Sequence, residues 1–82
     1  DIMLSNQYRL KDSLGTPITT FLPSYEVALK QLRALNINGQ DVEIFSAPSD
    51  QGRTIITKEV KVADAKYDPG RDEYGLFFTG DR

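Results

Sequence analysis

Alternating apolar and polar residues predict a β-hairpin near the start of the chain. Residues 7–11 place Tyr8 and Leu10 on one face and basic side chains on the other, as in a half-buried strand. Residues 18–22 are rich in β-branched and aromatic types, which favour strands. Turn-forming residues 12–17 separate the two segments, so we expect them to pair as a hairpin.

A second periodicity, that of a helix, follows Pro23 and Ser24. Apolar residues recur at the i, i+3, i+4, i+7 spacing, at Tyr25, Ala28, Leu29, Leu32 and Leu35. Ser24 is a candidate N-cap, and Glu26 lies in the first turn, where the helix dipole favours an anion. Asn36, Asn38 and Gly39 are candidates for a left-handed C-cap, with a hydrophobic contact from Ile37. The helix is therefore expected to end near Leu35.

Alternation returns in the second half of the chain and predicts three further strands. We expect strands at 41–46, at 53–62 and at 74–79, the second being the longest. Residues 46–53 read as a connection, and residues 63–66 as either a continuing strand or a short helical turn. Asp68-Pro69-Gly70-Arg71 has the pattern of a type II turn.

The order β-β-α-β-β-β predicts a single α+β domain over residues 1–82. Its sheet should be mainly antiparallel with four or five strands, and the amphipathic helix should pack on one face. We expect residues 1–6 and 80–82 to fray. Met3 reads as a native start preceded by two extra residues.

Composition narrows the chemistry that such a domain can perform. The 82 residues contain no Cys and no His, which excludes disulfides, thiolate nucleophiles, cysteine-built zinc sites and the commonest general base. Ten basic and twelve acidic residues give a net charge of −2, which weakens the case for binding to phosphates. Neither a membrane span nor a secretory signal is visible, and we expect a cytoplasmic protein.

Clustered carboxylates are the first candidate for a functional site. They surround the Pro-Gly turn at Asp64, Asp68, Asp72 and Glu73. Their spacing does not match an EF-hand, and Lys66 and Arg71 neutralise part of the charge, so we expect a solvated loop and no metal. No glycine-rich nucleotide loop occurs, and without His we expect no catalysis, cofactor or small-molecule substrate.

Apolar residues left on the sheet face away from the helix are the strongest functional indication. We expect Phe21, Phe45, Ile55 and Phe77 to be anchors of an interaction surface, with a polar rim of Arg9, Lys11, Glu59 and Lys61. This predicts a non-catalytic protein-binding module, such as an adaptor, an accessory subunit or a small inhibitor. Phage and mobile-element products that block host machinery often have such compositions, which is an analogy only.

The same residues are compatible with nucleic-acid binding, with self-association and with a covered aromatic face. The basic strand residues and the Phe side chains could bind RNA or single-stranded nucleic acid. A long strand at 54–62, or an exchanged C-terminal strand, could join two copies into a homo-oligomer. The sheet could also curl, or its loops fold across, so that the aromatic face is covered.

Overall fold

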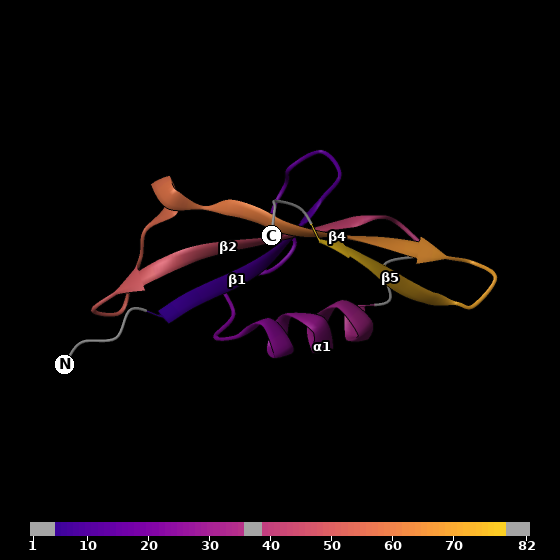
Figure 1. Ribbon diagram of the computed structural model, residues 1–82, viewed down its shortest axis with the longest axis horizontal. Helices are drawn as coiled ribbons and strands as arrows, with labels where there is room; N and C mark the ends of the chain where they lie inside the picture. Colours follow the sequence, from indigo (N-terminus) through magenta and orange to yellow (C-terminus); the bar gives the residue numbers. More distant parts are fainter. Residues whose placement is uncertain (1–4, 36–38, 79–82) are drawn as a thin grey trace.

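The computed structural model of the chain describes residues 5–35 and 39–78, which form an α+β domain (Figure 1). Within them lies an open, antiparallel five-stranded sheet with one α-helix, as the residue pattern predicts. The elements are β1 (Ser5–Asp12), α1 (Tyr25–Leu35), β2 (Val42–Asp50), β3 (Arg53–Thr54), a short 3₁₀-helix η1 (Ile56–Lys58), β4 (Val60–Asp68) and β5 (Glu73–Phe78). The strand order is β1-β2-β4-β5, and β3 pairs with the end of β2.

Helix α1 begins where its capping residue predicts. The Ser24 hydroxyl oxygen accepts a hydrogen bond from the Val27 N–H at 3.2 Å. The described part of the helix extends to Leu35, and residues 36–38, which include the cap candidates Asn36 and Asn38, lie outside the described residues. Gly39 has a φ of +76°, and a Cβ built there would lie 3.0 Å from the Tyr67 ring. Glycine is therefore required by both conformation and space.

The core lies between α1 and one face of the sheet. Its buried members are Leu10, Ala28, Leu32, Val42, Ile44, Ala63 and Ala65. Helix α1 approaches β1 more closely than the other strands, and lies below it in Figure 1. The helix is thus off-centre, and the β4–β5 hairpin is the less covered part of the sheet.

The prediction of a regular strand at 18–22 is wrong. The segment nevertheless lies beside β1, as the predicted hairpin requires. It runs along the edge of β1 with isolated bridges at Lys11↔Pro17 and Tyr8↔Leu22. Proline has no N–H to donate, and the Thr19 hydroxyl accepts from the Leu10 N–H at 3.2 Å. A side chain here takes the place of a backbone carbonyl, which interrupts a continuous ladder.

The long strand predicted at 53–62 is also wrong. Strand β2 extends to Asp50, and a two-residue turn at Gln51 and Gly52, both with positive φ, leads into the short β3. The 3₁₀-helix η1 then interrupts the chain before β4 begins at Val60. Residues 63–66, for which a helical turn was the alternative, belong to β4.

The β4–β5 hairpin has a different turn from the type II turn expected. Positive φ falls on Asp72 (55°) and not on Gly70, and the Arg71 N–H donates to the Asp68 carbonyl at 3.1 Å. The Asp68 carboxylate accepts from the Gly70 N–H at 3.0 Å, which holds the turn from inside. In β5, Leu76 pairs with the core residue Ala65, so even-numbered residues face α1, as the alternation predicts.

Candidate functional site

Three charged residues form a compact cluster on the far face, the sheet face away from α1. Arg9 and Lys11 alternate along β1, and Glu59 lies between η1 and β4. The Arg9 guanidinium donates to both Glu59 carboxylate oxygens at 2.6 and 2.9 Å, and Lys11 Nζ donates at 2.9 Å. Their side chains are only 17%, 14% and 8% exposed for Arg9, Lys11 and Glu59. We call these three residues the charge cluster.

The charge cluster shifts the pKa values of its members in opposite directions. The hydrogen bond from Arg9, reinforced by Lys11, lowers the pKa of Glu59 although burial opposes the shift. The same hydrogen bond raises the pKa of Arg9. Both shifts favour the charged forms of Arg9 and Glu59, and the single carboxylate offsets one of the two positive charges of the cluster.

Two of the predicted aromatic anchors lie under these cations. The Arg9 guanidinium is 4.5 Å from the centre of the Phe21 ring, and Lys11 Nζ is 4.1 Å from that of Phe45. Both rings are half-buried. The structure therefore brings Arg9, Lys11, Phe21, Phe45 and Glu59 together.

Of the remaining predicted site residues, Lys61 lies opposite Phe45 in the β2–β4 pair, next to the charge cluster. Lys61 on β4 forms ion pairs with Asp64 at 3.1 Å and with Glu43 at 3.7 Å. Phe77 lies opposite Asp64 in the β4–β5 pair, with its ring exposed. Ile55 stands apart from both, at the N-cap of η1, and is half-buried.

The described residues provide no cluster for metal chemistry. Among residues 5–35 and 39–78, no group of three or more acidic side chains is placed to hold an ion. In the hairpin turn, the Tyr67 hydroxyl donates to Asp72, and Arg71 lies between Asp68 and Glu73 at 4.0 and 3.8 Å. Over the same residues, α1 is too short and too polar to cross a bilayer.

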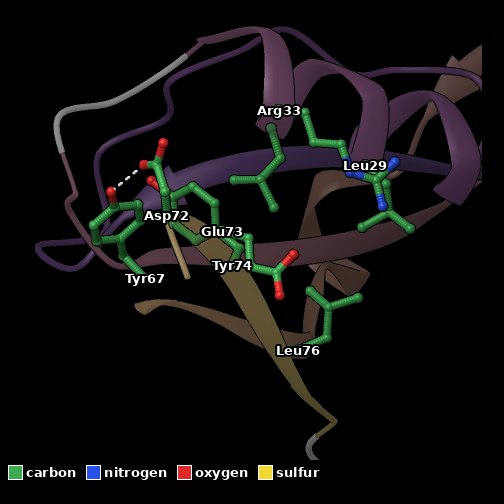
Figure 2. Close-up of a pocket in the computed structure, with 8 residues that line it drawn as sticks. Leu29, Arg33, Tyr67, Asp72, Glu73, Tyr74 and Leu76 are labelled. Carbon is green, nitrogen blue, oxygen red and sulfur yellow. Dashed lines mark hydrogen bonds between the residues drawn. The ribbon is translucent and has the colours of Figure 1, made fainter. Parts of the chain in front are cut away.

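A cleft of about 380 Å³ lies between the second half of α1 and the β4–β5 hairpin (Figure 2). Its lining comprises Leu29, Leu32, Arg33, Tyr67, Asp72, Glu73, Tyr74 and Leu76. Leucine side chains from α1 and from β5 face one another across it, and charged groups stand at its hairpin end. Leu32 is also a buried core member, and Leu29, Tyr74 and Leu76 pack against the core, so the cleft borders the core. The residue pattern does not predict the cleft, because it does not show how far the helix lies from β5.

Hydrogen bonds hold the tyrosine wall of the cleft in place. The Tyr74 hydroxyl donates to the Gln40 carbonyl at 2.9 Å, and the Tyr67 N–H donates to the Asp41 carboxylate at 3.2 Å. The two rings meet edge to face at 5.5 Å. Burial raises the pKa of Tyr74, and the Asp72 carboxylate raises the pKa of Tyr67, so both hydroxyls stay protonated. The cleft is thus preformed on this side.

Strand β5 ends the sheet beside this cleft and carries two exposed rings. Phe77 and Phe78 are 56% and 69% exposed, one on each face of the strand. The Phe78 ring touches only the outer part of the core, with its centre 6.3 Å from that of Tyr25. Within the described residues, no strand pairs with the outer side of β5. Alternation predicts the exposure of Phe77 but not that of Phe78.

Comparisons of the chain with protein-family models, with curated proteins and with solved structures give no match.

Proposed function

We propose that this protein is a non-catalytic protein-binding module, acting as an adaptor, an accessory subunit or a small inhibitor. The observation that carries the proposal is the edge strand β5, which has exposed Phe77 and Phe78 at one end and the cleft along its side. Exposed aromatic side chains next to a concave surface are typical of the anchor region of a protein interface.

The far face supports this choice over nucleic acid. Each cation of the charge cluster is directed at Glu59, and Lys61 is paired with Asp64 and Glu43. Binding to phosphates requires cations that are available to the backbone of the ligand. The proposed binding surface is accordingly the β5 side of the sheet. Of the four anchors that alternation predicts, it includes only Phe77.

Selection from a random dodecapeptide library displayed on phage tests the proposal. We expect peptides to be enriched on the wild-type protein and lost on Phe77→Asp and Phe78→Asp, because a carboxylate at either position disrupts an apolar contact. Leu14→Asp is the matched control, since Leu14 is almost fully exposed on the turn after β1. Circular dichroism verifies that each variant is folded.

Two results would contradict the proposal. One is a selection that yields no enriched peptide on the wild-type protein. The other is equal enrichment on the Phe77→Asp and Phe78→Asp variants, which would assign binding to another surface.

A further inference from the structure

The direction of the backbone groups on β5 follows from the hydrogen bonds of the opposite edge. Tyr8 exchanges backbone hydrogen bonds with Leu22, so even-numbered residues of β1 direct their N–H and C=O groups away from β2. These directions alternate along each strand and match across each antiparallel pair. Following the registers through β2 and β4, the even-numbered residues of β5 direct their groups outward. These residues are Tyr74, Leu76 and Phe78.

The same three residues face the helix side of the sheet with their side chains. Tyr74 and Leu76 line the cleft, and Phe78 lies beside it near Tyr25. A strand added to β5 would therefore place every second side chain on the cleft side, next to these residues. The residue opposite Leu76 would both form backbone hydrogen bonds and occupy the cleft.

We infer that β5 binds an extended peptide as an additional antiparallel strand, with one apolar side chain of the peptide in the cleft between α1 and β5. This inference deepens the proposed function and depends on it. Main-chain hydrogen bonds to an exposed sheet edge supply affinity in this mode, and pockets for alternate side chains supply specificity. A volume of about 380 Å³ is at the lower end of the range for ligand sites and suits a single anchor side chain.

The surroundings of the cleft define the chemistry of this peptide. In an antiparallel strand, the peptide residue opposite Phe78 is two positions before the anchor. An apolar side chain at that peptide position packs against the exposed Phe78 ring. The peptide residue opposite Glu73 is three positions after the anchor, and a basic side chain there meets an exposed carboxylate. The peptide motif is apolar-x-apolar-x-x-basic, where the second apolar residue is the anchor.

A synthetic decapeptide with this motif, Ser-Thr-Val-Thr-Leu-Thr-Thr-Lys-Thr-Ser, blocked at both ends and fluorescently labelled, tests the inference by anisotropy. We expect saturable binding with a dissociation constant below about 1 mM. A methyl group on the anchor Leu nitrogen should weaken binding by at least about tenfold, because that N–H points at β5. A methyl group on the nitrogen of the following Thr should have little effect, because that N–H points away.

Variants of the protein test the side-chain contacts. Leu29→Trp fills the cleft and should abolish binding, while Leu14→Asp should not change it. Glu73→Lys should weaken binding of the Lys-containing peptide by about twofold to fivefold, and a peptide with Glu in place of Lys should reverse this preference. Thermal melting of each variant verifies that the fold is retained.

The outcomes separate this inference from the function on which it depends. If library-selected peptides bind but the decapeptide does not, or if both methylated peptides bind equally, strand addition at β5 is wrong and the binding module stands. If no peptide of either kind binds, both fail. If sedimentation shows a dimer that Phe78→Asp dissociates, the edge belongs to a second copy, and the inference is overturned.

Discussion

Removal of the Glu59 carboxylate should destabilise this protein more than removal of a carboxylate from any of the more exposed ion pairs. In Glu59→Ala, the charge cluster loses three charge-assisted hydrogen bonds of 2.6, 2.9 and 2.9 Å, and Arg9 and Lys11 remain close together without a counter-charge. Loss of one partner from a fully buried pair costs about 3–5 kcal/mol. Arg9 and Lys11 are 17% and 14% exposed and can regain some hydration, so we expect about 2–3 kcal/mol.

The size of this effect is large for a small domain. A folded chain of this length has a free energy of unfolding of about 4–12 kcal/mol. The melting temperature should fall by about 10–20 °C. Urea unfolding at pH 7, followed by circular dichroism, measures the change directly. Glu43→Ala is the matched control: its carboxylate is 3.7 Å from Lys61 in a more exposed pair, and we expect no more than about 0.5 kcal/mol.

The pH dependence gives an independent measure of the same interaction. Folding lowers the pKa of Glu59 from its ordinary value of 4.5. The stabilisation contributed by the ionised Glu59 carboxylate is therefore present above pH 4.5. It disappears as the pH falls through the lower pKa that Glu59 has in the folded protein. The difference in unfolding free energy between wild type and Glu59→Gln should shrink over that range. A Glu59→Ala cost no greater than that of Glu43→Ala, or a difference that does not change with acid, would refute the reasoning.

Three further substitutions test the local structure, each by urea unfolding. Ser24→Ala should cost about 1 kcal/mol, because the Val27 N–H loses its cap, whereas Ser24→Asp should retain most of the stability. Gly39→Ala should cost at least about 1 kcal/mol, since its positive φ and the nearby Tyr67 ring both oppose a Cβ; an unchanged stability would show that the loop adapts. Tyr25→Phe should be neutral or stabilising by up to about 1 kcal/mol, because the buried Tyr25 hydroxyl has no partner within the described residues; a loss above that amount would reveal one.

Features determined by neighbours in the chain could be predicted from the sequence. The cap at Ser24 and the apolar stripe of α1 involve residues within a few positions of one another. The cap is confirmed, and within the stripe Ala28 and Leu32 are buried, whereas Leu35 at its end is exposed. The break between β3 and β4 could not be predicted, because the alternation of residues 53–62 is interrupted only at Lys58, and a lysine at that position is equally compatible with a continuous edge strand. Only the packing of the chain against β2 shows that residues 56–58 turn as a 3₁₀-helix.

The candidate site was harder to predict because it depends on distances across the fold. Arg9 and Glu59 were both expected at the surface, but the bond that joins them spans 50 positions in the chain. The cleft depends on the lateral position of α1, which leaves space beside β5. Periodicity identifies which face of the helix is apolar but not which strands that face covers.

The two outer strands of the sheet differ in a way that limits how the protein can assemble. The outer side of β1 is occupied by residues 17–22, through hydrogen bonds that include Ile18 N–H to the Leu10 carbonyl at 2.7 Å. Of these two strands, as far as the described residues extend, only β5 can accept another strand. A second copy that pairs through its own β5 therefore closes this edge, and backbone pairing between the described outer strands ends at a dimer. Growth into a fibril by repeated edge-to-edge stacking would first require residues 17–22 to detach from β1.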